Sequence, residues 1–268
     1  MARLPRYDCA GAVHHITSRG NRRENIFIDD MDRLAFIAIC KKALKRYEIV
    51  LHSFCLMSNH YHLIAESQHG NISRAMQYIN GCYAQYYNRL HGTCGHLFQG
   101  RFKAALIQRD VHLMEAARYV VLNPVRAGMV QLPDDYRWSS YNSAIGRDAE
   151  FGDLTSGRFV ADFFGSGDKY KRFVYDGING GIWNNLKYGC ILGDEEYAER
   201  EFKEMSRDNI PIKYAKKPDL FDIIRKNELW SGAAKAVCSY GYTYREVGRF
   251  LNMHASTVSR HVNRRLVI

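Results

Sequence analysis

The sequence predicts an α+β protein with a ferredoxin-like β-α-β-β-α-β unit and a small C-terminal helix-turn-helix domain. Two observations predict this fold. Over the first 120 or so residues, segments of alternating polarity and segments of helical spacing follow one another in that order. The last 40 residues instead contain three short helical segments. A hydrophobic content of 46% with 13% aromatic residues is enough for a packed core and excludes a disordered chain.

The first half of the unit has a strand, a helix and a strand pair. Residues 11–18 alternate apolar and polar side chains, as a half-buried strand does. Residues 30–46 carry apolar side chains at helical spacing. Two adjoining runs, 49–57 and 60–66, are typical of strands joined by a tight turn.

The second half repeats this order and adds a helix. The patterns predict a helix over 73–90, a strand over 102–108 and a further helix over 110–122. Because a proline disfavours helical backbone at the residue before it, Pro124 predicts that the last helix ends at about Asn123.

Charge divides the chain into three parts. Residues 1–149 form the β-α-β-β-α-β domain, 150–228 a mixed connector or accessory region, and 229–268 the helix-turn-helix module. The net charge of +10 is concentrated at both ends: residues 1–150 carry +6, residues 151–228 carry −1 and the last 40 carry +5. Two basic parts around a neutral middle indicate two surfaces for nucleic acid, although ordinary solubility charge has the same sign.

The sequence pattern of the C-terminal module predicts helices over 233–240, 244–251 and 257–265. In a helix-turn-helix the last helix enters the major groove. It would present four polar side chains there: Thr257, Ser259, Arg260 and Asn263. The alternative is a small helical packing domain with a solvated basic face.

Two histidines on one strand are candidate metal ligands. His60 and His62 are two residues apart, so both side chains point to the same face of the strand. Two neighbouring imidazoles can bind one divalent cation. The alternative is a pair of half-exposed strand histidines without a function.

A second pair of candidates lies on the helix that follows the last strand. Tyr119 and Asn123 are four residues apart and therefore share a helix face. The amide carbonyl could be a third metal ligand, and the cation could hold a phosphate against the phenol. The alternative is a core tyrosine followed by an asparagine that caps the helix.

Five segments resemble the HUH single-tyrosine transposases, in particular the REP-associated tyrosine transposase branch. In the family's order they are HHITSRGN (14–21), MSNHYHL (57–63), FQGRFK (98–103), YVVLNPVRAG (119–128) and WSSY (138–141). The resemblance covers about residues 5–146, over half of the chain. The resemblance implies the same ferredoxin-like fold.

The resemblance also implies an enzyme that cuts and rejoins single-stranded DNA, with hairpin or repeat sequences as substrates. Tyr119 would be the nucleophile and form a 5′-phosphotyrosine. His60, His62 and Asn123 would bind Mg²⁺ or Mn²⁺, which polarises the scissile phosphate. Basic side chains are candidates to hold the strand: Arg19, Arg22, Arg23, Arg101 and Lys103. Relatives of this kind are monomers or homodimers.

Composition and the site residues bear on the alternatives. The chain has no apolar run of the roughly 18 residues that span a membrane, and its seven cysteines form no Cys-x-x-Cys pair, so we expect a cytoplasmic protein. Three alternatives remain: a replication-initiator or relaxase-like nicking enzyme, a DNA-binding regulator that no longer cuts, and a metal-dependent hydrolase unrelated to DNA. An intact set of His60, His62 and Tyr119 argues against the regulator, and the basic C-terminal module argues against the hydrolase.

Overall fold

The computed structural model describes most of the chain: residues 8–109, 111–155, 158–178, 186–207, 219–225, 227–240 and 242–265. The chain divides into two compact units. The larger is Arg6–Ala198, and the smaller is Glu199–Ile268 together with the first five residues. Among the described helices, none has the length and apolarity that crossing a lipid bilayer requires.

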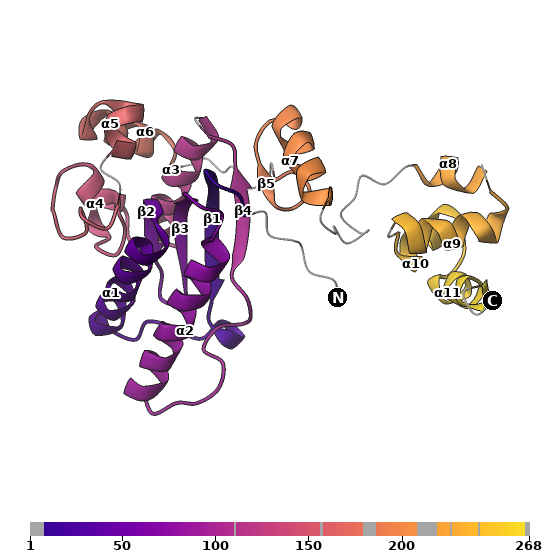
Figure 1. Cartoon of the computed structure of the whole chain (residues 1–268), viewed down its shortest axis with the longest axis horizontal. Coiled ribbons are helices and arrows are strands. Elements are labelled where there is room, and N and C mark those ends of the chain that lie inside the picture. Colours follow the sequence, from indigo (N-terminus) through magenta and orange to yellow (C-terminus); the bar gives the residue numbers. More distant parts are fainter. Residues whose placement is uncertain are drawn as a thin grey trace. The chain divides into compact units, whose positions relative to one another are not determined.

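A five-stranded sheet is the centre of the larger unit (Figure 1). Its strands are β1 (Ala12–Arg19), β2 (Ile49–Leu56), β3 (His60–Ser67), β4 (Lys103–Ile107) and β5 (Ile191–Leu192). The order across the sheet is β2-β3-β1-β4-β5, in which the first four strands pair antiparallel and β5 pairs parallel to β4. Helix α1 (Asp30–Tyr47) connects β1 to β2, and α2 (Ile72–Leu90) connects β3 to β4. The predicted β-α-β-β-α-β order is therefore present, and β5 is an addition that the sequence did not predict.

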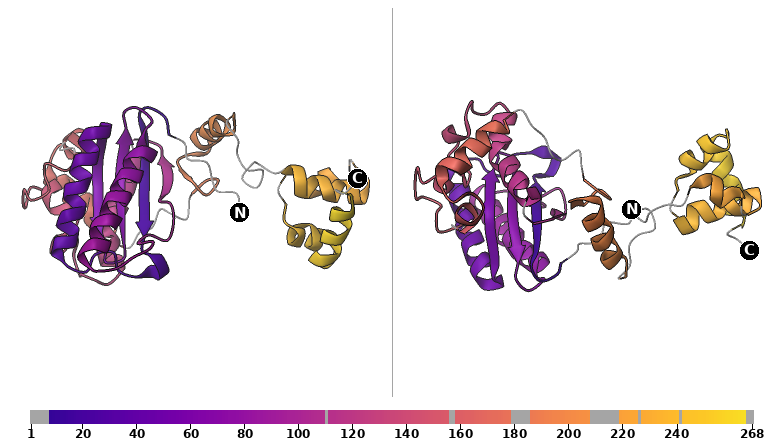
Figure 2. Two further views of the ribbon diagram at one scale, coloured as in Figure 1. Left: turned by 60° about the horizontal axis from the view of Figure 1, so that its bottom comes forward. Right: turned by 90° about the horizontal axis from the view of Figure 1, so that it is seen from above.

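The two faces of the sheet are covered by different helices. Tyr61 of β3 packs against Phe36 of α1, with ring centroids 4.8 Å apart, and its hydroxyl donates to Asn80 of α2 at 2.6 Å. The next residue, His62, points the other way and packs against Tyr119 of α3 (Val111–Arg126). Helices α1 and α2 thus cover one face (Figure 2), and α3 lies on the opposite one.

Helix α3 (Val111–Arg126) does not end where the sequence predicted. The prediction of an end at Asn123 was wrong, since Pro124 lies inside the helix and Ala127 N–H still donates to the Asn123 carbonyl at 2.9 Å. Proline has no N–H for the carbonyl four residues earlier, which belongs to Val120. The Asn123 side-chain amide donates to that carbonyl instead, at 3.2 Å. The helix therefore continues, and Tyr119 lies two turns inside it.

The accessory region packs with the sheet rather than apart from it. Beyond the boundary expected near residue 150, the larger unit continues to Ala198. Buried side chains of this region, among them Phe151, Leu154 and Tyr170, belong to the same hydrophobic core as the sheet. Its first two helices are α5 (Arg158–Phe164) and α6 (Gly167–Asp176), and η2 (Pro133–Asp135) and α4 (Tyr141–Ala144) precede it in the chain.

The smaller unit is helical. After α7 (Glu195–Arg207), which spans the division between the units, come α8 (Leu220–Arg225), α9 (Leu229–Tyr240), α10 (Tyr244–Phe250) and α11 (Ala255–Arg265). Helix α10 begins with a capping box, in which the Thr243 side chain accepts from the Glu246 N–H and the Glu246 side chain accepts from the Thr243 N–H. The core of the last four helices is small and apolar: Ile223, Ala233, Ala236, Val247, Val258 and Val262.

Candidate active site

His60 and His62 lie side by side at one end of β3. Their ring centroids are 4.9 Å apart, and both side chains line a cavity of about 330 Å³. The remaining lining residues come from the end of β1 and from the chain around the start of β4: Thr17, Ser18, Arg19, Gln99, Gly100, Arg101 and Lys103. The cavity thus combines two imidazoles with three cationic side chains.

Both imidazoles are neutral at neutral pH. Burial, and to a smaller degree Arg19, lowers the pKa of His60 to about 4. Burial is also the main reason why the pKa of His62 lies well below its ordinary value, and His15, His60 and Arg19 add to it. His60 Nδ1 lies 2.6 Å from Asn59 Oδ1, so this nitrogen donates and Nε2 carries the lone pair. His62 Nε2 is buried and has no hydrogen-bond partner among the described residues.

His15 is a site residue to which the sequence assigned no role. Its Nε2 lies 2.8 Å from His62 Nδ1, and the two rings stack with centroids 5.1 Å apart. Burial lowers the pKa of His15 to about 3, so this imidazole is neutral too. Alternation along β1 puts His15 and Thr17 on one face, and Thr17 is paired with His62. The signal was therefore present in the sequence, but reading it required the register between β1 and β3.

The ring of Tyr119, on α3, packs against His62 and His15. It meets His62 edge-on at 6.2 Å between centroids and His15 in the same manner at 6.3 Å. Burial raises the pKa of Tyr119, and the nearby Arg126 opposes this increase. The phenol is therefore protonated at neutral pH and needs an electrostatic partner before it can act as a nucleophile.

Asn123 lies one turn after Tyr119 on the same helix. Its Nδ2 donates to the carbonyls of Tyr119 and Val120, at 3.0 and 3.2 Å. These bonds fix the orientation of the side-chain amide. Its other polar atom, Oδ1, is a carbonyl oxygen, and carbonyl oxygens bind cations. Among the described residues, no three His, Cys, Asp or Glu side chains form a group that could hold a metal ion. A cation at the histidine pair would therefore need an amide, water or phosphate oxygen to complete its shell.

The predicted basic residues of the larger unit gather near this cavity. Arg19, Arg101 and Lys103 are exposed and line it directly. Arg22 and Arg23 lie next to it in η1 (Asn21–Arg23) and have left-handed backbones, with φ of 51° and 66°.

Backbone hydrogen bonds hold the two basic loops together. Asn21 N–H donates to the Leu97 carbonyl at 2.8 Å, and Gln99 N–H donates to the Arg19 carbonyl at 2.9 Å. Gly20 lies between them in a place without room for a side chain, because a Cβ there would be 2.1 Å from the Glu24 carbonyl oxygen. Hydrogen bonds between the two loops thus hold the backbone that carries the cationic side chains.

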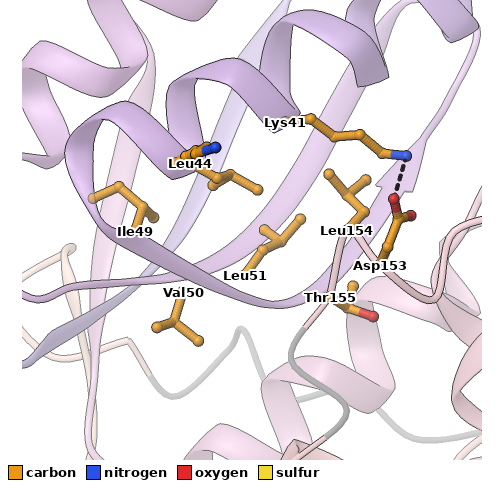
Figure 3. A pocket seen from close by; sticks show the side chains of 9 residues that line it. Lys41, Leu44, Ile49, Val50, Leu51, Asp153, Leu154 and Thr155 are labelled. Carbon is orange, nitrogen blue, oxygen red and sulfur yellow. Dashed lines mark hydrogen bonds and ion pairs between the residues drawn. The ribbon is translucent and has the colours of Figure 1, made fainter.

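A second cavity is lined by side chains of a different kind from those of the first. It has a volume of about 430 Å³ and lies between α1, β2 and residues 153–155 (Figure 3). Lys41 and Asp153 form an ion pair of 2.8 Å across it, and its other lining residues are mainly aliphatic. The ion pair ties the accessory region to α1, and no histidine is among the residues that line this cavity.

The candidate residues of the smaller unit all belong to α11. Arg260 is exposed, and Thr257 and Ser259 are half-buried. Asn263 lies in the same helix, but its side chain is outside the described part of the structure.

Comparison with known proteins finds similarity in the larger unit. A family model described as "Transposase IS200 like" matches residues 10–123, somewhat under half of the chain. A solved structure described as the REP-associated tyrosine transposase bound to a REP hairpin is similar with a TM-score of 0.47 and 20% identity, over 55% of this chain and 87% of that one. A tRNA(His) guanylyltransferase from Saccharomyces cerevisiae is similar with a TM-score of 0.35 and 11% identity, over 70% of this chain and 87% of that one. No curated protein matches the chain. The matched segment contains both histidines of the cavity and extends to Asn123; over residues 10–123 the chain is similar to the IS200-like transposases.

Proposed function

We propose that this protein is a transposase that cuts and rejoins single-stranded DNA at hairpin or repeat sequences through a 5′-phosphotyrosine on Tyr119. The observation that carries the proposal is the packing of Tyr119 against His62, in a site of neutral imidazoles bordered by Arg19, Arg101 and Lys103. A nucleophile, a candidate cation site and a phosphate-binding surface are what cleavage by a tyrosine requires.

The reaction exchanges one phosphodiester for another. The Tyr119 oxygen attacks the scissile phosphorus and loses its proton to solvent. The bond from phosphorus to the 3′ oxygen breaks, and that oxygen leaves as a 3′-OH after taking up a proton. Attack of a 3′-OH on the phosphotyrosine reverses these steps and joins two strands. Because each step conserves the number of phosphoester bonds, the reaction needs no external source of energy.

The residues present fit a divalent cation. His62 offers a buried and unpartnered Nε2, and His60 offers the Nε2 lone pair that its bond to Asn59 leaves available. Oδ1 of Asn123 would be the third ligand. Mg²⁺ or Mn²⁺ bound there would polarise the scissile phosphate. Imidazole ligands favour Mn²⁺ over Mg²⁺.

The chain's own cations would bind the DNA strand. Arg19, Arg101 and Lys103 lie next to the histidines and would hold the phosphates closest to the cut. Arg22 and Arg23 would extend this contact along the strand. Each is proposed as a phosphate contact, which gives affinity and a salt dependence rather than sequence choice.

The smaller unit is proposed as a helix-turn-helix that binds duplex DNA. Helices α10 and α11 are joined by a short turn in which Asn252 has a left-handed backbone, with φ of 52°. They approach closely, because a Cβ on Gly248 would be 2.6 Å from the Met253 carbonyl oxygen. Helix α11 would read the major groove with Thr257, Ser259, Arg260 and Asn263, and the net charge of +5 on residues 229–268 supports this.

End-labelled oligonucleotides test the proposed cleavage. Purified protein is incubated with single-stranded hairpin oligonucleotides and Mg²⁺ or Mn²⁺, and covalent products are separated on a denaturing gel. With a 3′ label we expect the label to migrate with the protein; with a 5′ label we expect a shortened free strand that ends in a 3′-OH. Chelation should abolish both products. Binding without any covalent product, over a range of hairpins and both metals, would contradict cleavage and leave the non-cutting regulator.

A further inference from the structure

The accessory region holds the tyrosine helix through two arginines. Arg118 Nη1 donates to the Phe173 carbonyl at 3.1 Å, and its guanidinium lies 4.2 Å from the centre of the Phe173 ring. Two turns further along α3, Arg126 Nη2 donates to the Gly177 carbonyl at 3.2 Å. The end of α6 and the residue after it thus anchor α3 at two points.

The second arginine also contacts the proposed nucleophile. The Arg126 guanidinium carbon lies 4.8 Å from the centre of the Tyr119 ring. The two residues are seven apart on one helix, which places them on the same face. The guanidinium is a permanent cation and is attracted to the π face of the ring. The Tyr119 ring therefore has two imidazoles and a guanidinium as neighbours.

We propose that Arg126 is a positioning residue for Tyr119: its guanidinium, fixed by the Gly177 carbonyl, holds the phenol at the histidine pocket and presents positive charge to it. The inference rests on the proposed role of Tyr119 as the nucleophile. It also gives the accessory region a function, since residues 173–177 supply the carbonyl and the ring that keep the helix in place.

The electrostatics agree with this geometry. The Arg126 guanidinium carries its positive charge 4.8 Å from the centre of the Tyr119 ring. A cation next to the ring stabilises the negative charge that the phenol oxygen acquires as it loses its proton, and this charge is largest during attack on phosphorus. Loss of the contact should therefore slow the attack without the same loss of DNA affinity.

Kinetics of Arg126→Ala and Arg126→Lys test the proposal. At saturating oligonucleotide, we expect Arg126→Ala to form the covalent product about tenfold more slowly, the size expected from loss of one cation–π contact of roughly 1.4 kcal/mol. The Kd for the oligonucleotide should change by far less. Added guanidinium ion should restore part of the rate, and equal NaCl should not. Arg126→Lys should be intermediate because it keeps the charge without the planar group.

A fluorine probe reports the contact without relying on activity. 3-Fluorotyrosine is placed at position 119, and its ¹⁹F resonance is compared in the parent chain, in Arg126→Ala and in Arg137→Ala. Arg137 is the control, because its guanidinium also lies over an aromatic ring, that of Trp138, at 4.7 Å from the ring centre. We expect the resonance to move in Arg126→Ala and to stay near the parent position in Arg137→Ala. If Arg126→Ala does not fold, Arg126→Lys and Arg126→Gln take its place.

The outcomes separate this inference from the proposed function. A parent protein without covalent product refutes the function, while the resonance still decides whether Arg126 sits on the Tyr119 ring. A parent that forms the product, with Arg126→Ala at an unchanged rate and an unchanged resonance, refutes the inference alone. Weaker DNA binding with an unchanged rate at saturation would also refute it, because Arg126 would then be a phosphate contact only.

Discussion

At the scale of single residues, the site depends on how His62 is oriented. Its two ring nitrogens have different surroundings: Nδ1 is paired with His15, and Nε2 has no partner among the described residues. If Nε2 binds a cation, Nδ1 must carry the proton and donate to His15 Nε2. His15 would then fix both the tautomer and the ring direction of a ligand without touching the cation.

This role makes His15 testable through metal affinity. We expect His15→Ala to weaken Mn²⁺ binding by about tenfold or more, the usual effect of losing a hydrogen-bond partner of a ligating histidine. Titration of the DNA-free protein followed by electron paramagnetic resonance measures this directly. His69→Ala is the control, since His69 is exposed and pairs with Glu48. Equal Mn²⁺ affinity of His15→Ala and the parent protein would show that His15 does not orient His62.

The histidine pair itself should separate cutting from binding. We expect His60→Ala and His62→Ala to abolish the covalent product, because each removes one of two imidazole ligands. Single-strand affinity should largely survive through Arg19, Arg101 and Lys103. Asn123→Ala should impair cleavage less, because water can replace a neutral amide ligand. Product formation by His62→Ala in the presence of a chelator would end the metal hypothesis.

Part of the site could be predicted from local sequence, and part could not. Alternation with period two was enough to place His60 and His62 on one face. The role of His15 could not be predicted, because it depends on which residue of β3 pairs with which residue of β1. The role of Arg126 could not be predicted either, because its hydrogen-bond acceptor, the Gly177 carbonyl, lies 51 residues further along the chain.

At the scale of elements, most strands and helices of the larger unit follow from periodicity, and the exceptions have identifiable causes. Helix α3 passes through Pro124 because the side chain of Asn123 bonds the carbonyl that proline leaves without a donor. Strand β5 has two residues and exists only through parallel pairing with β4. A hydrogen bond from one side chain and a strand of two residues leave no periodic pattern in the sequence, so periodicity could predict neither.

The docking of α6 gives a prediction about pH. Asp134 accepts hydrogen bonds from Tyr175 Oη at 2.6 Å and from Lys171 Nζ at 3.0 Å, both from α6. Burial alone would raise the pKa of Asp134, but these bonds outweigh it and lower the pKa below 3.8. A lowered carboxyl pKa stabilises the fold above pH 3.8, and this contribution is lost as the pH falls through the folded-state value.

We therefore expect Asp134→Asn to be less stable than the parent protein at pH 7, by about 1 kcal/mol. The difference should shrink below pH 3.8, where the parent carboxylate takes up a proton. Denaturant unfolding of both proteins across this range measures it. A difference that stays constant down to pH 2 would mean that the charge of Asp134 does not hold α6.

At the scale of the whole molecule, the chain combines two compact units with separate cores. The sequence showed that both ends of the chain are basic. The accessory region between them packs into the core of the larger unit through buried aromatic residues such as Phe151 and Tyr170. Composition could not predict this packing, because residues 151–228 are close to neutral overall and their helix-like runs do not show which surface they pack against.

Two proposed DNA surfaces should respond to different substrates. We expect Arg260→Ala to weaken binding to duplex DNA and, through loss of a positive charge that displaces a counterion, to lower the slope of log K against log salt by about one. Covalent product formation on a short single strand should be unchanged. Titrations at several salt concentrations measure the slope. Equal affinities and equal slopes for variant and parent would argue that α11 does not bind DNA.

The central claim is that one phenol among 18 tyrosines carries the chemistry. The direct measurement is mass spectrometry of the covalent product after nuclease and protease digestion, with Tyr119→Phe and Tyr78→Phe compared in the same assay. Tyr119→Phe removes a single oxygen, so fold and DNA binding should persist while the product disappears. Tyr78→Phe, on α2, should retain it. The account predicts a nucleotide 5′-phosphate on the peptide that contains Tyr119; a phosphotyrosine elsewhere, or undiminished product from Tyr119→Phe, would contradict it.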